Sequence, residues 1–307
     1  YNAKVIVIDI EQAELDKLPD RFIKICANLQ DIVPKFLEGI SSLDFDNDFS
    51  VWHQEINELK SRYADEPFFY RHSAKEPISI YEFVNSFSNQ LVGGEIIVTG
   101  SSGLAVEVFY THFKNKVNQR TFLTTGLGAM GYGLPGLLGV SEATNEKVFL
   151  FESDGSLMMN IQELQSLKAR GRDTIIFIMN NNGYASIRST QKNYFDGRLV
   201  ATSPDSGLTV PDISKVADCF GFQFFKLQNF CDIDATIQKV INATGQILCE
   251  VVLKEDELLL PKCAVFKLED NTLVSAPLED MNPLLHIEDL RNAMGDEIDE
   301  ASFEIRK

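Results

Sequence analysis

The chain has 307 residues, 44% of them hydrophobic, and a formal net charge of −17. This length exceeds the usual single domain, so we expect more than one structural unit with a large core. The acidic balance argues against a nucleic-acid partner, which needs clustered Lys and Arg, and no apolar run approaches the roughly 18 residues of a membrane span.

The N-terminal part is typical of the end of an α/β domain. Residues 3–10 are dense in β-branched side chains and predict a buried strand, followed by a short helix or turn at 11–18, a strand at 23–27 and an amphipathic helix at 29–40. The chain starts at Tyr1 without a methionine, and its first strand begins almost at once. We therefore expect residues 1–40 to close a domain whose earlier strands lie upstream in a longer polypeptide.

Residues 41–75 are expected to form a linker that contains a helix at 51–63. From residue 76 to 255 predicted helices and strands alternate, which favours a parallel sheet with right-handed crossovers and helices on both faces, an α/β fold. The elements in order are a helix at 80–91, a strand at 95–99, a turn at 100–103, a helix at 104–113, a strand at 148–152, a helix at 157–170, a strand at 174–179, a helix at 213–220, a strand at 223–226, a helix at 233–242 and a strand at 247–253. The pattern decays in residues 256–307, which predicts a tail packed on the surface.

Two oxygen-rich loops follow neighbouring predicted strands. Ser153-Asp154-Gly155-Ser156 comes after the strand at 148–152, and Asn180-Asn181-Asn182-Gly183-Tyr184 comes after the strand at 174–179. Parallel strands connected by a crossover helix bring both loops to the carboxyl edge of the sheet, where such folds bind ligands.

The chemistry of the two loops suits a magnesium-bound diphosphate. The carboxylate of Asp154, the amide oxygen of Asn181 and the main-chain carbonyl of Gly183 are the hard oxygen ligands that Mg²⁺ prefers. Gly155 and Ser156 open a helix, so their N–H groups can face a phosphate. Either segment alone would equally suit a helix cap or a tight turn. Their combination at crossover spacing favours the metal site.

On these residues the chain resembles the thiamine diphosphate-dependent enzymes of the acetohydroxyacid synthase and pyruvate decarboxylase group. Their motif is Gly-Asp-Gly, followed after the next strand by Asn-Asn. The resemblance implies that Asp154 and Asn181 supply side-chain metal ligands and that Gly183 supplies a main-chain oxygen. It also places Tyr184 in the cofactor-binding loop. Ser153 departs from the family, which mostly has glycine there, and this bears on the tightness of the turn.

Two further segments resemble the same family. Gly126 to Pro135 is similar to the loop that holds the aminopyrimidine ring, which implies that the Gly128 carbonyl accepts a hydrogen bond from the ring and that Met130 is the apolar wedge that bends the cofactor. Without the flanking glycines, Met130 would be read as a core methionine. Gly100-Ser101-Ser102 resembles the loop that adds hydroxyl and amide contacts to the diphosphate.

A dinucleotide fingerprint is the competing interpretation of the glycine-rich segment. Gly126, Gly128 and Gly131 match its spacing, and the acid expected some 20 residues later would be Glu152 or Asp154. Asp154 lies past the end of the next strand and opens a loop of its own, which disfavours a nicotinamide cofactor.

The resemblance extends over essentially the whole chain. It implies that residues 76–255 form the complete thiamine diphosphate-binding (PP) domain, with thiamine diphosphate and Mg²⁺ as cofactors. It further implies decarboxylation of a pyruvate-like 2-keto acid and transfer of the acyl-anion equivalent to a carbonyl acceptor, as in acetolactate synthase. In this family the activating glutamate belongs to an N-terminal pyrimidine-binding domain of the same or a partner chain, so no catalytic acid or base is named here. The family also implies a homodimer or homotetramer.

Finer expectations concern substrate and compartment. Ala185–Lys192 and Pro277–Met281 resemble synthase-type members from sugar or polysaccharide gene sets, and we expect Arg188 and Lys192 to be solvated surface charges rather than contacts to an anionic substrate. Five cysteines without a C-x-x-C pair indicate reduced thiols in a cytoplasmic protein, and the four scattered histidines disfavour a zinc site. The alternatives are a non-oxidative 2-keto-acid decarboxylase, and a non-catalytic paralogue acting as a binding subunit if Ser153 abolishes cofactor binding.

Overall fold

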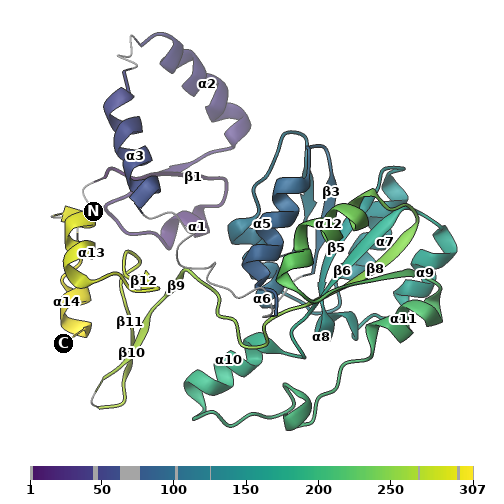
Figure 1. Ribbon diagram of the computed structural model, residues 1–307. Coiled ribbons are helices and arrows are strands. Elements are labelled where there is room, and N and C mark those ends of the chain that lie inside the picture. Colours follow the sequence, from purple (N-terminus) through teal and green to yellow (C-terminus); the bar gives the residue numbers. More distant parts are fainter. Residues whose placement is uncertain are drawn as a thin grey trace. The chain divides into compact units, whose positions relative to one another are not determined.

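The computed structural model describes residues 3–43, 48–62, 77–100, 103–124, 126–268, 270–295 and 298–306. The chain divides into two compact units (Figure 1). One comprises Tyr1–Ala64 and Ile287–Phe303, and the other comprises Asp65–His286 and Glu304–Lys307. No helix in the described part of the chain is long and apolar enough to cross a bilayer.

The first unit contains the predicted strand–helix–strand motif. β1 (Ile6–Asp9) pairs in parallel with β2 (Ile23–Cys26), and α1 (Gln12–Asp16) connects them. The helices α2 (Leu29–Ser41) and α3 (Ser50–Arg62) follow, close to the predicted ranges. In α2 the amide oxygen of Asn28 caps the helix by accepting a hydrogen bond from the main-chain N–H of Gln30 at 2.9 Å.

The second unit is built on a six-stranded sheet, and each neighbouring pair of its strands is parallel. Its order is β4-β3-β5-β6-β8-β7. The strands are β3 (Ile96–Thr99), β4 (Arg120–Phe122), β5 (Val148–Ser153), β6 (Thr174–Asn180), β7 (Gln223–Leu227) and β8 (Gln246–Val252). The chain passes from β3 outward to β4 and then returns to the other side of β3 to form β5. This change of direction makes the β3–β5 boundary a topological switch point, where open α/β sheets bind ligands.

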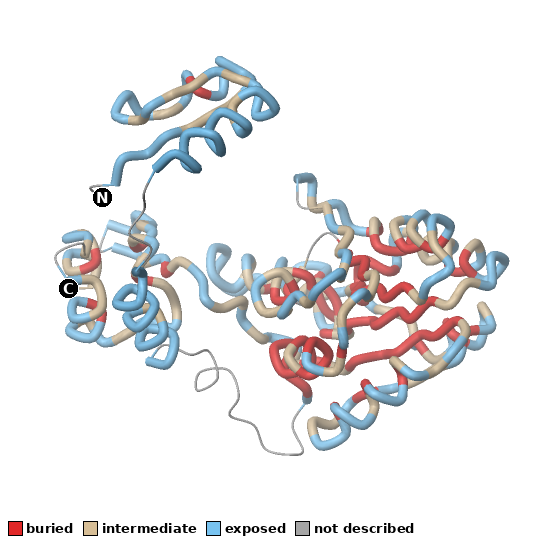
Figure 2. The backbone as a smooth tube through the Cα atoms, turned by 90° about the horizontal axis from the view of Figure 1, so that it is seen from above, coloured by how far each residue is buried: buried red, intermediate tan, exposed pale blue. Residues whose placement is uncertain are grey.

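Helices cover both faces of this sheet, which confirms the predicted fold class. One face carries α5 (Ile80–Gln90), α6 (Leu104–His112) and α12 (Ile233–Asn242), and the other carries α7 (Gly133–Ala143), α9 (Glu163–Arg170) and α11 (Ile213–Phe220). Alternate strand residues enter the two cores, so the inner strands β3, β5, β6 and β8 are buried, whereas the edge strands β4 and β7 are partly exposed (Figure 2).

An aromatic cluster fixes the centre of the sheet to α5. The ring of Phe87 lies edge-on to Phe151 of β5 and Phe177 of β6, with centroid separations of 4.8 Å and 5.3 Å. Phe83 contacts the same two rings from the preceding turn of the helix. The capping box of Ser79 and Glu82 sets where this helix begins. The cluster therefore holds the strand whose carboxyl end leads to Asp154.

Several elements differ from the expectations. The predicted helix at 157–170 is two elements, α8 (Asp154–Leu157) and α9. β4, α7 and α10 (Ala185–Tyr194) have no predicted counterpart. The sequence of α7 is rich in glycine, which lowers helix propensity, but glycine at 133 leaves room for the Glu152 carboxylate against the helix. Tertiary packing therefore overrides the local signal.

The C-terminal segment is more ordered than the expected irregular tail. β9 (Lys262–Cys263) pairs antiparallel with β12 (Met281–Asn282), and β10 (Val265–Lys267) pairs antiparallel with β11 (Leu273–Ser275). Two helices follow, α13 (Ile287–Met294) and α14 (Ala301–Ile305), and two 3-10 turns lie earlier in the chain at Pro204–Ser206 and Phe230–Asp232. These strands are too short for a sequence period to reveal them. The predicted domain boundaries at residues 40, 75 and 255 remain predictions.

Replacing Phe87 by alanine should strongly destabilise the second unit. The side chain is fully buried among five other phenylalanine rings, so Phe87→Ala should lower the free energy of unfolding by about 3–5 kcal/mol in urea titrations. Val92→Ala, at a side chain that is 91% exposed, is the control and should change it by less than about 0.5 kcal/mol. Equal effects of the two changes would contradict the assignment of this core.

Candidate functional site

The predicted loops meet at the carboxyl edge of the sheet. Ser153 of β5 is in register with Met179 of β6, so Asp154 lies level with Asn180, the last residue of β6. On the other side of β5, the N–H of Gly100 donates to the carbonyl of Phe151 at 2.7 Å. The loops that follow β3, β5 and β6 are therefore neighbours at the switch point.

Asp154 joins two of these loops directly. Its carboxylate is fully buried; Oδ2 accepts a hydrogen bond from the N–H of Gly183 at 2.8 Å, and Oδ1 accepts one from the N–H of Gly155 at 2.7 Å. Burial raises the pKa of Asp154 to about 6, against the lowering effect of these two main-chain donors. A cation beside the carboxylate would offset the desolvation that burial imposes.

Asn181 presents an amide oxygen that lacks a protein partner. Its side chain is buried, and its Oδ1 makes no hydrogen bond with any described residue. The preceding Asn180 differs, because its amide donates to Glu250 Oε1 at 2.6 Å and its Oδ1 accepts from the N–H of Asn182 at 3.0 Å. Buried polar atoms are normally paired. An orphaned amide oxygen in the loop that contacts Asp154 therefore fits a hard cation such as Mg²⁺.

Glycine is required at two positions of the site. Gly183 has φ +116°, and a Cβ there would lie 2.6 Å from the carbonyl oxygen of Thr202. A Cβ on Gly155 would collide with the ring of Tyr184. The ring of Tyr184 thus lies against Gly155 in the loop of Asp154, while Gly183 approaches the Thr202 carbonyl.

Ser156 connects the Asp154 loop to the glycine-rich segment. Its hydroxyl accepts a hydrogen bond from the N–H of Gly131 at 2.8 Å, and the Asn160 amide donates to the carbonyl of Gly131 at 2.8 Å. Asn160 was not singled out in the sequence, although it lies on the turn that separates α8 from α9. These bonds bring the predicted ring-binding segment to the same edge of the sheet.

The glycine-rich segment keeps its apolar side chains accessible. Gly128 has φ +58°, and the side chain of Leu127 is almost fully exposed. Met130 is 39% exposed, so it is not an ordinary core methionine. The predicted contacts of Ser101 and Ser102 lie outside the described residues.

Ser153 closes its turn without strain. Its φ and ψ are −84° and 149°, an extended backbone that any residue adopts. Its N–H donates to Glu152 Oε1 at 3.0 Å. The turn at Ser153, whose tightness the departure from glycine put in question, is therefore free of backbone strain.

Glu152 is a buried carboxyl group whose role the sequence did not reveal. It lies between Gly100 and Gly133, where a Cβ on Gly100 would approach its Oε1 to 2.6 Å and a Cβ on Gly133 would overlap its Oε2. Burial raises the pKa of Glu152 to about 7. Enclosed in this way, it cannot serve as the acidic group that a dinucleotide ribose needs. A charged residue at the end of the apolar run 148–151 is the feature of the sequence that could have indicated this buried carboxyl group.

Arg188 corrects an expectation. Its side chain is buried, with only 3% of the residue exposed, whereas we expected a solvated surface charge. Lys192, one turn later on α10, has 44% of its side chain exposed and forms an ion pair with Asp256 at 2.8 Å, in line with the expectation. The sequence places Arg188 and Lys192 four residues apart on one helix, and this spacing does not show that one is buried and the other exposed.

Other metal chemistry has no support in the described residues. They hold no group of three or more His, Cys, Asp or Glu side chains placed to bind an ion. All five cysteines, which the structure describes, are free thiols.

A pocket of about 780 Å³ lies in the second unit, and the described residues that line it include none of the predicted site residues. α6 and α10, which follow the loops after β3 and β6, form part of its wall, and the segment from Glu257 to Pro283 forms much of the rest. Six residues of α10 line it, and four of them follow the spacing of one helix face: Ser186, Ser189, Thr190 and Asn193. Because α10 begins directly after Tyr184, the wall that it forms follows the proposed metal loop in the chain and carries hydroxyl and amide groups.

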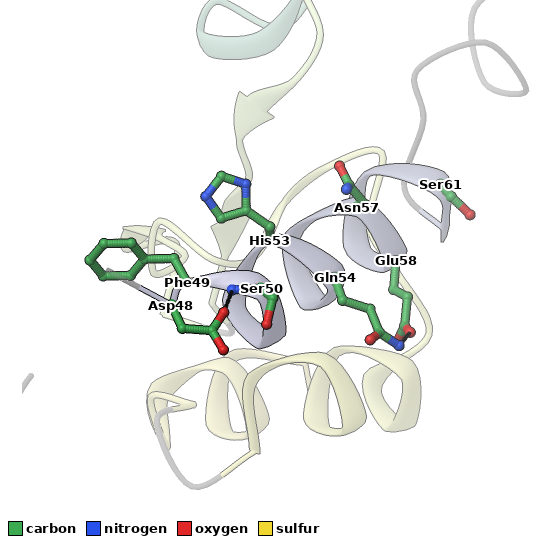
Figure 3. Close-up of a pocket in the computed structure, with 8 residues that line it drawn as sticks. All are labelled: Asp48, Phe49, Ser50, His53, Gln54, Asn57, Glu58 and Ser61. Atoms are coloured by element: carbon green, nitrogen blue, oxygen red, sulfur yellow. Dashed lines mark hydrogen bonds between the residues drawn. The ribbon is translucent and has the colours of Figure 1, made fainter. Parts of the chain in front are cut away.

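A second pocket, of about 810 Å³, is an open depression along α3 in the first unit (Figure 3). Two of its polar side chains are engaged locally: Asp48 accepts from the main-chain N–H of Ser50 at 3.0 Å, and the Gln54 amide donates to Glu58 at 3.0 Å. It contains none of the predicted site residues.

Sequence comparison with known proteins identifies the family of this chain. Residues 100–251 match the family described as thiamine pyrophosphate enzyme, C-terminal TPP binding domain. The large subunit of acetolactate synthase isozyme 1 from Escherichia coli (strain K12) is 30% identical over 264 residues, which cover 85% of this chain and 44% of that protein. The acetolactate synthase large subunit of Cyanidium caldarium is 28% identical over 271 residues, with 86% and 44% covered. Chloroplastic acetolactate synthase 1 of Nicotiana tabacum is 26% identical over 278 residues, with 84% and 39% covered. The chain thus spans less than half the length of these relatives.

Replacing Gly183 by alanine should destabilise the protein more than a left-handed backbone conformation alone would, because the added Cβ also collides with a neighbouring carbonyl. Gly183→Ala combines a left-handed backbone with a collision against Thr202, and it should lower the free energy of unfolding by about 3 kcal/mol. Gly197, with φ +74° and open space around its Cβ position, is the matched control and should cost only about 1 kcal/mol. Chemical denaturation measures both, and equal costs would refute the close approach at Gly183.

Proposed function

Because the chain belongs to the thiamine diphosphate-dependent enzymes and is acetolactate synthase-like, we propose that it is the cofactor-binding portion of a carboligase that acts on a 2-keto acid. The observation that carries this proposal is the hydrogen bond from Gly183 to Asp154 in the loop that also bears the orphaned amide oxygen of Asn181. The activity of the whole protein is part of the proposal, since this chain covers less than half of its relatives.

In the proposed site the three metal ligands come from two loops. Asp154 supplies a carboxylate oxygen, Asn181 its amide oxygen and Gly183 its carbonyl, and the diphosphate and water would complete the coordination of Mg²⁺. When bound, thiamine diphosphate supplies the carbanion chemistry that decarboxylation of a 2-keto acid requires. The protein's task is to orient the cofactor through these ligands and to keep its diphosphate out of bulk water.

The other predicted residues would surround the remainder of the cofactor. Gly100, Ser101 and Ser102 would contact the diphosphate at the end of β3. The Gly128 carbonyl would accept a hydrogen bond from the aminopyrimidine ring, and the accessible side chain of Met130 would support its bent shape. The bonds that Ser156 and Asn160 make with Gly131 support this arrangement, because they tie the ring-binding segment to the metal loop.

We further propose that the carbonyl acceptor occupies the pocket beside α10 and is hydroxylated, as a sugar-derived aldehyde or ketone would be. The support is the row of polar side chains that α10 directs into this pocket, immediately after the metal loop. An apolar ligand would strip water from these hydroxyl and amide groups without replacing their hydrogen bonds, which costs free energy. A hydroxylated ligand replaces those hydrogen bonds and therefore binds more favourably.

Assembly and compartment complete the proposal. The activating glutamate would come from a pyrimidine-binding domain of the same or a partner chain, within a homodimer or homotetramer. Five free thiols fit a reducing compartment such as the cytoplasm.

The runner-up functions are a decarboxylase and a non-catalytic paralogue. With pyruvate and a hydroxyaldehyde supplied together, a carboligase releases carbon dioxide and joins the two-carbon unit to the aldehyde as a hydroxyketone, whereas a decarboxylase releases carbon dioxide and acetaldehyde. The paralogue requires that Ser153 abolish cofactor binding, and the unstrained backbone at this residue gives that reading no support.

Calorimetric titration of the full-length protein with thiamine diphosphate tests the metal site. Binding should require Mg²⁺, Asp154→Ala should abolish its metal-dependent part, and Asn181→Ala should weaken it by at least about tenfold, because each removes a ligand. The control Asn193→Ala, at an exposed position of α10, should bind the cofactor like the parent. If Asp154→Ala bound the cofactor as tightly as the parent, the metal assignment would be wrong.

Acceptor competition tests the pocket. Thr190→Val removes a hydroxyl at nearly constant volume, so it should raise the KM for a hydroxyaldehyde acceptor about tenfold while leaving the KM for the 2-keto acid donor within about twofold. Ile187→Ala, on a part of α10 that does not line the pocket, is the control. An unchanged KM for the hydroxyaldehyde in Thr190→Val would rule out this acceptor site.

A further inference from the structure

We infer that Arg188 is a positioning residue that holds the metal loop in its ligating conformation and ties it to the segment that follows β8. The inference rests on the proposed function for the identity of the cation, but the contacts that carry it belong to the protein alone. They explain why an arginine is buried on a helix whose other charged residue, Lys192, is exposed.

The guanidinium of Arg188 donates to four main-chain carbonyls. Nη2 donates to Asn181 at 2.7 Å and to Glu255 at 2.6 Å, while Nη1 donates to Thr202 at 2.8 Å and to Asn182 at 3.1 Å. Two of these carbonyls belong to consecutive residues of the metal loop. A planar group with several fixed donors can span such a set, whereas a lysine ammonium cannot reach all four from one point.

These bonds act on a backbone that needs support. Asn182 has φ +62° and Gly183 has φ +116°, so two consecutive residues of the loop adopt the left-handed region. Such conformations persist where surrounding contacts determine them. By drawing the carbonyls of Asn181 and Asn182 toward itself, Arg188 fixes the peptide planes on either side of Asn182. One plane contains the Cα of Asn181 and the other contains the Cα of Gly183, so these bonds anchor the backbone at both proposed ligand residues of the loop.

The same residue connects the loop to the strand end next to it. Leu253, directly after β8, donates its N–H to the carbonyl of Asn180 at 2.9 Å, and the Asn182 amide donates to Glu255 Oε1 at 2.9 Å. Arg188 adds its bond to the Glu255 carbonyl and an ion pair with Asp256, whose Oδ1 lies 3.5 Å from Nε. Residues 253–256 are thus bonded both to the metal loop and to Arg188, and Arg188 links the loop to this segment.

Arg188 is also unsuited to the alternative role of binding an anionic substrate. Its described donors all point to main-chain carbonyls or to Asp256, and the residue is 97% removed from solvent. A substrate could reach the guanidinium only by displacing these partners. The residue therefore acts through the loop that it holds rather than by touching the reactants.

The test compares three variants of the full chain. Arg188→Met removes all the hydrogen-bond donors of the side chain. Arg188→Lys keeps the positive charge but loses the planar guanidinium with its two terminal nitrogens. Lys192→Met removes the other ion-pair partner of Asp256 and leaves the bonds to the loop carbonyls in place. Thiamine diphosphate binding is titrated against Mg²⁺ concentration, and amide hydrogen exchange is measured in the cofactor-free protein.

In Arg188→Met the Mg²⁺ concentration for half-maximal cofactor binding should rise at least about tenfold, as expected for a residue that supports metal ligands. Arg188→Lys should fall between this variant and the parent, and Lys192→Met should stay within about twofold of the parent. Saturating Mg²⁺ should restore most of the cofactor affinity. The amides of Gly183 and Leu253 should exchange at least about tenfold faster in Arg188→Met, while those in β5 and β6 keep their protection.

Two results would overturn the inference. One is a parent-like Mg²⁺ midpoint and parent-like exchange at Gly183 and Leu253 in both Arg188 variants. The other is an equal loss of protection throughout the sheet, which would make Arg188 a general stability residue. If Arg188→Met does not fold, Arg188→Lys decides between these outcomes. If the parent itself binds no thiamine diphosphate, the proposed function fails, while the exchange data still show whether Arg188 holds the loop.

Discussion

The site depends on one hydrogen bond between two loops, from the N–H of Gly183 to the buried carboxylate of Asp154. This bond brings the only carboxylate of the proposed metal site into the loop that carries Asn181. It also explains the glycine at 183, because the backbone there is left-handed and touches the Thr202 carbonyl. Without this contact the two loops would be separate turns with no shared ligand chemistry.

The parallel sheet makes that bond possible. The register of β5 against β6 sets both loops at the same level, and the switch of strand order beside β3 leaves the edge open for a ligand. Phe87 and its neighbouring rings attach α5 to β5 and β6 on one face of the sheet. On the far side of the metal loop, Arg188 links its carbonyls to the segment after β8. Packing, register and a buried charge thus act together on the position of a few oxygen atoms.

Much of this could be predicted from the sequence, because it follows from local patterns. The runs at 148–152 and 174–179 are long, apolar and flanked by polar turns, so their strands and the loop that begins at Asp154 were recognised. The rest depends on tertiary contacts. A glycine-rich segment became α7 because its missing side chains make space for Glu152, and Arg188 is buried because four carbonyls converge on it. Neither fact has a periodic signature.

The most direct measurement is a crystal structure of the full-length protein with thiamine diphosphate and Mg²⁺. The account predicts one cation about 2.1 Å from a carboxylate oxygen of Asp154, the amide oxygen of Asn181 and the carbonyl of Gly183, with diphosphate oxygens completing its octahedron. A diphosphate bound elsewhere, or a cation at this edge that omits Asp154 and Asn181, would contradict it.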